Sequence, residues 1–385
     1  MIPSTVVPQL AAHKTPFYYY DLDLLRSTLQ EIKTYALDEG YHVHFALKAN
    51  HQPRIIQEIR KAGLGADCVS GGEIQQALDT GYSPSEIAFA GVGKSDEEIL
   101  LGLKHDIFCF NVESVQELEV IQELATKTGK TARVALRINP NVDADTHEYI
   151  TTGKKENKFG INEEDLDHVL HLLSGMDHIK LIGIHFHIGS QITNLEPFQQ
   201  LCSKANTLNN HIEEKGFNLS VINVGGGFGI NYDHPDEESI PDFKHFFSMF
   251  REHITLKNHQ QLHFELGRSV VGQCGSLITK VLYIKSGRAK SFAVVDAGMT
   301  ELIRPALYQA KHKIDVLSSN AEPKIYDVVG PICESSDTFV KDYAMPEVQR
   351  GDLIALRSAG AYGEVMRSRY NLRPEFAPVF SDDLK

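Results

Sequence analysis

The sequence predicts an α/β barrel domain joined to an all-β domain. Strand-like apolar runs alternate with amphipathic helical segments eight times between about residues 24 and 268, which is the repeat of a (β/α)8 TIM barrel. From about residue 270 onward, short β-rich pieces follow one another with turn residues between them, as in an all-β domain. A chain of 385 residues is also too long for one ordinary hydrophobic core. Periodicity alone leaves a doubly wound open sheet as an alternative to the barrel.

The expected strands of the barrel are short apolar runs that precede helical segments. They cover residues 42–48, 65–69, 87–90, 107–110, 133–138, 181–187, 221–225 and 262–265. The clearest helical segments between them cover residues 97–103, 115–127 and 164–173. The β-rich pieces of the second domain cover residues 275–284, 291–296, 324–330 and 352–358. Residues 15–21 are also strand-like, although they precede the barrel pattern, and the polar stretch 151–158 is expected to be a solvated loop.

Composition excludes several classes of function. The net charge is −13 and no basic stripe occurs, which argues against a nucleic-acid partner. The N-terminus lacks a signal pattern and no apolar run reaches spanning length, so no membrane association is expected. The cysteines are odd in number and form no CxxC pair, which argues against disulfides and structural zinc and for a reducing cytoplasm. They are Cys68, Cys109, Cys202, Cys274 and Cys333.

Lys48 is the most informative single residue. It ends the first apolar run of the barrel pattern, with the helix breaker Pro53 just beyond. An ammonium group enclosed at such a position loses its proton and becomes nucleophilic, so it can bind a carbonyl cofactor covalently. A strand-end lysine taken alone is more often a surface residue. The functional interpretation therefore depends on the residues that accompany it.

Other polar residues and glycines also follow predicted strands, at the end where (β/α)8 enzymes place catalysis. His187 ends the sixth strand, the glycine run 225–229 follows the seventh, and residues 265–268 follow the eighth. The glycine run offers backbone amides to a phosphate, although a tight strand-to-helix turn explains it about as well. It fits neither the dinucleotide pattern, because position 230 is Ile230, nor the P-loop pattern.

Paired histidines and a strand-end carboxylate leave alternatives open. His185 and His187 share one face of their strand, as do His42 and His44, so a metal-dependent hydrolase with imidazole ligands is a competing interpretation. For the first pair we expect a structural role, because that strand already ends in a lysine. Glu265 lies at an apolar strand end, where an isolated carboxylate is costly. A protonated pyridine nitrogen of a bound cofactor is a suitable partner, and an internal ion pair with Arg268 is the less favoured alternative.

The motifs in this order resemble the fold-type III pyridoxal 5'-phosphate (PLP) decarboxylases, most closely the diaminopimelate branch. They are Lys48, His185-Phe186-His187-Ile188-Gly189-Ser190-Gln191, Gly225-Gly226-Gly227-Phe228-Gly229, Glu265-Leu266-Gly267-Arg268, Cys333-Glu334-Ser335-Ser336-Asp337 and Ala359-Gly360-Ala361-Tyr362-Gly363. The resemblance extends from residue 48 to residue 362 and includes residues 149–153 and 158–161. It implies an alanine-racemase-like barrel over residues 24–270. A β-sandwich or β-barrel domain would then combine residues 1–23 with residues 271–385.

The resemblance also implies roles for individual residues. The catalytic residues would be Lys48 and Cys333, with either returning a proton to the product. The cofactor would contact Lys48, His187, Ser190, Gly225, Gly226, Gly227, Glu265, Leu266, Gly267, Arg268 and Tyr362. The far end of the substrate would contact Arg268, Arg304, Tyr308, Glu334 and Tyr362. The family usually has Glu-Pro-Gly-Arg where this chain has Leu266 in place of proline, which affects turn rigidity rather than side-chain chemistry.

The activity implied by the resemblance is PLP-dependent conversion of meso-2,6-diaminopimelate to L-lysine and carbon dioxide, the last step of lysine biosynthesis. It also implies a homodimer with shared active sites, since Cys333 and Glu334 come from the opposite subunit in the family. A decarboxylase of a basic amino acid or of a carboxyspermidine-type substrate would not need Arg304. An amino-acid racemase would have no use for the Cys333-Glu334 pair, and PLP-carrier proteins lack a second domain.

Overall fold

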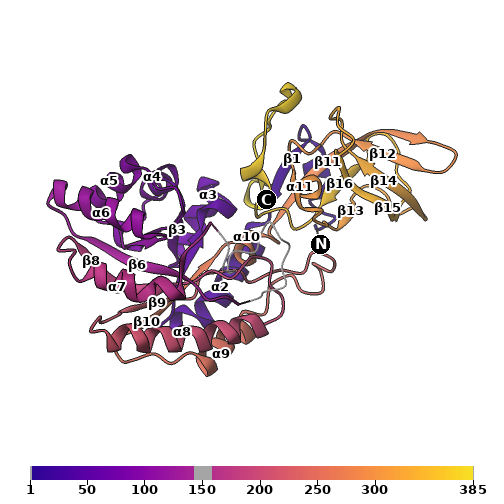
Figure 1. Ribbon diagram of the computed structural model, residues 1–385. Helices are drawn as coiled ribbons and strands as arrows, with labels where there is room; N and C mark the ends of the chain where they lie inside the picture. Colours follow the sequence, from indigo (N-terminus) through magenta and orange to yellow (C-terminus); the bar gives the residue numbers. More distant parts are fainter. Residues whose placement is uncertain (1, 143–157, 385) are drawn as a thin grey trace. The chain divides into compact units, whose positions relative to one another are not determined.

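The computed structural model describes residues 2–142 and 158–384. The chain forms two compact units. One unit combines Leu29–Gly229 with Asp242–Gly267, and the other combines Met1–Thr28, Ile230–Pro241 and Arg268–Lys385. Figure 1 shows that the first unit contains most of the helices and the second most of the long antiparallel strands. No helix within the described ranges is long and apolar enough to cross a membrane.

The first unit is a closed barrel of eight parallel strands. The strands are β2 (His42–Ala46), β3 (Gly65–Cys68), β4 (Ile87–Phe89), β5 (Cys109–Val112), β6 (Ala132–Asn139), β8 (Ile179–His185), β9 (Val221–Asn223) and β10 (Gln261–Leu266). They follow the order β5-β4-β3-β2-β10-β9-β8-β6, and the pairing of β5 with β6 closes the ring. The predicted barrel is therefore confirmed over the open sheet. The short strand β7 (Ile161–Asn162) adds to β6 outside this ring.

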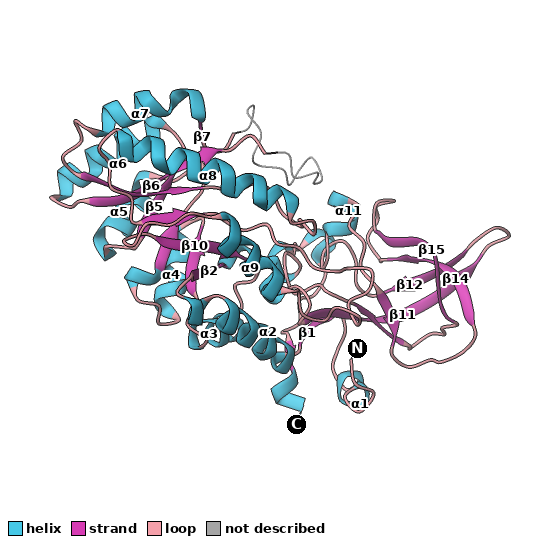
Figure 2. Cartoon of the chain, turned by 90° about the horizontal axis from the view of Figure 1, so that it is seen from below, coloured by secondary structure: helices cyan, strands magenta, loops and turns pink. Residues whose placement is uncertain are grey.

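Helices surround the barrel strands, as Figure 2 shows. They are α2 (Leu22–Tyr35), α3 (Pro53–Lys61), α4 (Gly71–Asp79), α5 (Asp96–His105), α6 (Val115–Thr128), α7 (Leu166–Leu173), α8 (Glu196–Glu214) and α9 (Phe243–His253). Three of them begin at a serine with a glutamate three residues later, and the serine hydroxyl accepts a hydrogen bond from the backbone N–H of that glutamate. These caps explain why α4, α5 and α6 begin where they do.

The second unit is built on a mostly antiparallel sheet around the long strand β11 (Gly275–Ser286). The sheet order is β13 (Ile314–Val316), β16 (Leu353–Leu356), β11, β12 (Ser291–Val295), β14 (Pro323–Val329) and β15 (Thr338–Pro346). The early strand β1 (Phe17–Tyr20) pairs antiparallel with β11 and parallel with β17 (Val379–Phe380). Short helices α1 (Val7–Ala11), α10 (Arg268–Val271) and α11 (Arg304–Tyr308) complete the unit.

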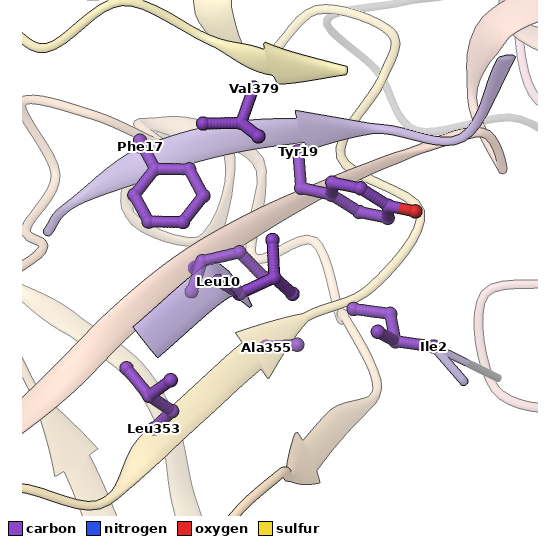
Figure 3. Packing of buried hydrophobic residues seen from close by; sticks show 8 residues of the cluster. Ile2, Leu10, Phe17, Tyr19, Leu353, Ala355 and Val379 are labelled. Carbon is purple, nitrogen blue, oxygen red and sulfur yellow. The ribbon is translucent and has the colours of Figure 1, made fainter. Parts of the chain in front are cut away.

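The two ends of the chain share one hydrophobic cluster in this unit. Phe17 and Tyr19 alternate along β1, so both project to one side of the strand, and Figure 3 shows both on the side where Leu10 lies. The cluster consists of Ile2, Leu10, Phe17, Tyr19, Ile278, Leu353, Ala355 and Val379. Each large apolar side chain buried in this way stabilises the fold by about 1.5–3 kcal/mol. This burial is what fixes the N-terminal segment onto the β-rich unit.

Candidate active site

Polar groups of the barrel gather at the carboxyl ends of its strands. Lys48 lies in a 3₁₀ turn (η2, Leu47–Ala49) directly after β2, and His187 lies two residues after β8. Both strands thus end two residues earlier than the sequence predicted, because the chain turns before the functional residue rather than at it. The glycine run begins two residues after β9, and Glu265 is the penultimate residue of β10. The topology therefore brings these four features to one rim.

Asp67 of β3 is the ion-pair partner of Lys48. Its carboxylate Oδ2 accepts a hydrogen bond from the Lys48 Nζ at 3.2 Å, and its side chain is completely buried. Burial and then the negative charge of Glu265 raise the pKa of Asp67 to about 7, against the opposing effect of Lys48. An acid with this pKa can exchange a proton with the lysine near neutrality.

Glu265 is held by three hydrogen-bond donors inside the barrel. Its Oε1 accepts from the amides of Asn111 and Asn223, each at 2.8 Å, and its Oε2 lies 2.7 Å from His185 Nε2. Burial alone would raise the pKa of this carboxyl, but the charge and hydrogen bond of His185, followed by the charge of Lys48, hold it well below its usual range. Glu265 is therefore an oriented carboxylate that is ionised near neutral pH.

The same contact fixes the tautomer of His185. A carboxylate only accepts hydrogen bonds, so the Nε2 atom of His185 must carry the hydrogen. Its Nδ1 atom is buried without a hydrogen-bond partner in the described part of the chain. His185 was expected to pack or to support other site residues, and the structure places it directly behind Glu265.

The glycine run is shaped by close backbone approaches. A Cβ atom at Gly225 would overlap the carbonyl oxygen of Phe186, and one at Gly226 would overlap that of Glu265. Gly225 and Gly227 also have φ angles of 70° and 109°, which glycine adopts readily. Only glycine therefore fits at these positions. The Gly225 N–H itself donates to Asn223 Oδ1 at 2.9 Å.

His187 offers a neutral aromatic ring beside this run. The Gly226 N–H points at its Nδ1 atom at 3.4 Å. Burial first, and then the positive charges of Arg137 and Lys48, hold the pKa of His187 well below its ordinary value. The site thus combines an amine, a glycine-rich turn, a neutral ring and an ionised carboxylate. These groups fit the aldehyde, the phosphate, the ring and the ring nitrogen of PLP in turn.

The predicted substrate residues lie in the β-rich unit, where two arginines flank a tyrosine. Arg268 Nη1 donates to the Tyr232 hydroxyl at 2.6 Å, and its guanidinium lies 4.9 Å from the centre of the Tyr362 ring. The Arg304 guanidinium lies 4.8 Å from the Tyr232 ring centre. Tyr308 is the last residue of α11 and lies three residues after Pro305.

Cys333 and Glu334 occupy an exposed loop between β14 and β15. Glu334 Oε1 accepts a hydrogen bond from the Tyr370 hydroxyl at 2.9 Å. Residues 149–153, which carry part of the resemblance, and most of the predicted polar loop 151–158 fall outside the described residues.

Four residues of the two clusters were not found from the sequence. Asp67, Asn111 and Asn223 surround the lysine and the carboxylate, and Tyr232 lies between the arginines. Asp67 and Asn111 do occupy candidate strands or their ends, and a polar residue in an apolar strand is the signal that could have identified them. Tyr232 gives no comparable signal.

The histidines of the first strand contact other aromatic residues. His44 Nε2 lies 2.9 Å from His263 Nδ1, and both rings stack on Phe108. The described residues contain no group of three or more His, Cys, Asp or Glu side chains that could hold a metal ion. His44 and His263 thus form part of the barrel packing.

This packing predicts an acid-sensitive barrel. Burial lowers the pKa of His44 from 6.5 to about 4. Between pH 6.5 and pH 4, His44 therefore binds a proton in the unfolded chain but not in the folded chain. The free energy of unfolding should fall as pH drops through this window, by about 3 kcal/mol from His44 alone. Urea titrations at pH 7 and pH 4.5 should show a smaller loss for His44→Gln than for the parent. His168→Gln, at an exposed position, should leave the loss unchanged, and equal losses in all three proteins would contradict the assignment.

The barrel and its strand-end residues define the class of PLP-dependent decarboxylases. The family model "Pyridoxal-dependent decarboxylase, pyridoxal binding domain" matches residues 23–272. A diaminopimelate decarboxylase of Bacteroides thetaiotaomicron is 56% identical over 375 residues, which are 96% of each chain. One from Helicobacter pylori is 42% identical, covering 97% of this chain and 92% of its own. The chain therefore belongs to the diaminopimelate decarboxylase family.

Solved structures agree with this assignment. The crystal structure of diaminopimelate decarboxylase from Helicobacter pylori complexed with L-lysine matches with a TM-score of 0.91 and 41% identity, over 98% of this chain and 94% of that one. The enzyme from M. jannaschii in complex with L-lysine matches with a TM-score of 0.86 and 33% identity, over 96% and 88%. An arginine decarboxylase of a Chlorella virus, 20% identical, shares the fold.

Proposed function

We propose that this protein decarboxylates meso-2,6-diaminopimelate to L-lysine and carbon dioxide, the last step of lysine biosynthesis, with PLP as its cofactor. The observation that carries this function is the presence, on one chain, of the Lys48 and Glu265 cofactor set and of a buried pair of arginines. The first set serves any PLP decarboxylase. The second set suits a substrate whose far end carries a carboxylate, and a decarboxylase of ornithine or arginine would have no use for it.

The barrel residues would hold the cofactor. Lys48 would bind it covalently, the amides of the glycine run and the Ser190 hydroxyl would bind its phosphate, and His187 would lie against its ring. By resemblance to the family, Leu266, Gly267, Arg268 and Tyr362 would be further cofactor contacts. When bound, PLP supplies an electron-accepting ring that stabilises the negative charge left on carbon when carbon dioxide departs.

Side chains of the protein would hold and transfer the protons of the reaction. Glu265, kept ionised by His185 and Lys48, would hold a proton on the ring nitrogen and so keep the ring electron-poor. Asp67 would accept and return the proton that Lys48 gives up when the lysine acts as a nucleophile. Cys333 or Lys48 would then protonate the product carbon, as the resemblance to the family implies.

The far end of the substrate would be recognised by opposite charges. Arg304 and Arg268 would bind its carboxylate with planar forks, Tyr308 and Tyr362 would add hydroxyl donors, and Glu334 would bind its ammonium group. Leu266 replaces the usual proline of the turn, but the backbone of β10 there is regular and pairs with β2. The substituted position is thus held by strand pairing.

A homodimer with shared active sites is part of the proposed function. Cys333 and Glu334 would reach the active site of the partner subunit, where a cover is needed to exclude water from the carbanion. Support comes from the exposure of this region: Leu372 is 91% exposed and Tyr370, which bonds Glu334, is 47% exposed. A cytoplasmic location is proposed as well, because all five cysteines are free thiols. Neither a nucleic-acid partner nor a membrane is invoked.

Product analysis tests the function directly. Purified protein supplied with PLP and meso-diaminopimelate should release L-lysine and carbon dioxide in equal amounts. Ornithine, arginine and L-lysine, offered at the same concentration, should give far slower release of carbon dioxide. Release of carbon dioxide from ornithine or arginine but not from meso-diaminopimelate would replace this function with that of a basic-amino-acid decarboxylase.

Subunit exchange tests the shared site. Lys48→Ala and Glu334→Ala proteins should each be nearly inactive alone. A mixture allowed to exchange subunits should regain activity, approaching about a quarter of the parent's per site if exchange is random. This is because each heterodimer would contain one site with both residues intact and one with neither.

A control for the exchange experiment uses two variants of the same site. Lys48→Ala mixed with Glu265→Ala should stay inactive, since both residues belong to one barrel. Inactive Lys48→Ala and Glu334→Ala mixtures, once native mass spectrometry had shown heterodimers, would place Glu334 in the same subunit's site.

A further inference from the structure

Tyr232 has no part in the reaction proposed above, although it lies between the two arginines. It follows the glycine run by three residues and belongs to the β-rich unit. Its hydroxyl accepts a hydrogen bond from Arg268 Nη1 at 2.6 Å. The guanidinium groups of Arg268 and Arg304 lie 5.9 Å and 4.8 Å from its ring centre. One phenol thus contacts both cations of the cluster.

Arg304 is a buried cation whose identified partners are neutral. Its side chain is 5% exposed, and Nη1 bonds His312 Nε2 at 2.9 Å. His312 Nδ1 lies 2.8 Å from the carbonyl oxygen of Arg357, so Nδ1 carries the hydrogen and Nε2 only accepts. In the described part of the chain, no carboxylate lies within ion-pair distance of Arg304. A buried guanidinium in such surroundings is costly until an anion joins it.

Two acidic residues of the same unit are matched by other cations. Asp236 pairs with Lys313 at 2.6 Å and with Arg357 at 3.2 Å, and Asp315 pairs with Arg357 at 2.5 Å. The positive charge around Tyr232 also affects its hydroxyl. Burial would raise the pKa of Tyr232, but the charges of Arg268 and then Arg304 hold this pKa below its ordinary value. The cluster is therefore electropositive and suited to a small organic anion.

We propose that Tyr232 is a specificity-determining residue, whose hydroxyl donates a hydrogen bond to the substrate carboxylate held by Arg268 and Arg304. This role presupposes the diaminopimelate decarboxylase function proposed above. Without ligand, the phenol oxygen accepts from Arg268. When a carboxylate arrives, the arginine hydrogens turn to it, and the phenol O–H becomes free to donate to the same anion. A ligand that ends in an ammonium group gains nothing from this donor and is repelled by both arginines.

Binding of two inhibitors to the PLP-loaded protein isolates this contact. L-Lysine keeps the carboxylate of the far centre, whereas 1,5-diaminopentane lacks it. Tyr232→Phe should raise the inhibition constant of L-lysine and the KM of meso-diaminopimelate by roughly tenfold or more, as expected for a hydrogen bond to a charged group. The inhibition constant of 1,5-diaminopentane should stay within about twofold of the parent, and kcat should change much less than KM.

The matched control is Tyr343→Phe, which removes another phenol of the same unit. The Tyr343 hydroxyl bonds the backbone of Ile314, and its loss should leave all these constants unchanged. A second measurement needs no loss of the hydroxyl. With 3-fluorotyrosine at position 232, the fluorine resonance should move on addition of L-lysine and not on addition of 1,5-diaminopentane.

The outcomes separate this role from the proposed function. If the parent forms lysine from meso-diaminopimelate but Tyr232→Phe binds L-lysine as tightly as Tyr343→Phe does, the role of Tyr232 is wrong and the function stands. Equally weakened binding of L-lysine and 1,5-diaminopentane would also contradict the role of Tyr232. So would a fluorine resonance that does not move on addition of L-lysine. If the parent forms no lysine, the function itself fails, whatever the binding of L-lysine.

Discussion

Replacing Lys48 with alanine should abolish lysine formation and remove the visible absorption band of the PLP-loaded protein. The amine of Lys48 is the group that would bind the cofactor aldehyde. The Asp67 Oδ2 atom lies 3.2 Å from the Lys48 Nζ and can accept its proton. Turnover should fall by roughly a thousandfold or more, as when other enzymes lose the nucleophile of a covalent mechanism. Absorption spectra and initial rates measured with saturating PLP check this directly.

The variant should still fold. Removing the ammonium leaves Asp67 buried, but its carboxyl can accept a proton at little cost because its pKa is already raised to about 7. Lys61→Ala, which removes an exposed lysine from α3, is the control and should keep both colour and activity. Borohydride reduction of the parent should attach the cofactor to the peptide that contains residue 48. A label on another lysine, or a coloured and active Lys48→Ala protein, would contradict the assignment.

The barrel could be predicted because its signal repeats. Eight apolar runs with intervening helical segments are visible in the sequence, and a closed parallel ring is one of few ways to bury them all. Strand limits were less accurate. The fourth predicted strand, 107–110, is observed as Cys109–Val112, because the apolar Phe108 stacks on the histidine pair and lies before the strand.

Strands of the β-rich unit were harder to predict. β15 (Thr338–Pro346) was not foreseen, since its alternation is interrupted by a run of exposed or half-exposed residues. Its pairing with β14 also shifts register twice, so no strict period of two survives in the sequence. β13 spans only three residues, too few for any pattern. In both cases tertiary pairing, rather than local sequence, defines the strand.

Some residues of the site could likewise be predicted from the sequence, and others could not. Residues at strand ends could be placed from the sequence because barrel topology brings all such ends together. The donors around Glu265 could not, because their placement depends on register: β8 and β9 pair His185 with Asn223, which brings both side chains to one level of the barrel. Tyr232 contacts Arg268 and Arg304 across 36 residues or more of sequence, and nothing local predicts that contact.

Replacing Arg304 with alanine should lower kcat/KM for meso-diaminopimelate, the second largest effect that we predict. The loss should be selective for this substrate. An arginine that bonds a carboxylate in a desolvated pocket contributes roughly 2–5 kcal/mol on truncation, which is a loss of about thirtyfold to several thousandfold in kcat/KM for meso-diaminopimelate. Any slow decarboxylation of L-lysine or ornithine should change far less. In the orientation in which their only carboxylate is lost, the far end carries an ammonium group and no carboxylate. Rates on the three substrates, measured at saturating PLP, give the comparison.

Two further variants separate recognition from folding. Arg350→Ala removes an exposed arginine that lies over the Tyr283 ring and should leave every rate unchanged. Arg304→Lys keeps the charge but loses the planar fork and with it the bond to His312, so its rate on meso-diaminopimelate should lie between those of the parent and the alanine variant. Because alanine leaves a cavity shaped for a guanidinium beside Tyr232 and His312, added guanidinium ion should restore part of the lost rate. Equal losses on all three substrates, without such rescue, would mean that Arg304 supports the fold or the cofactor instead of selecting the substrate.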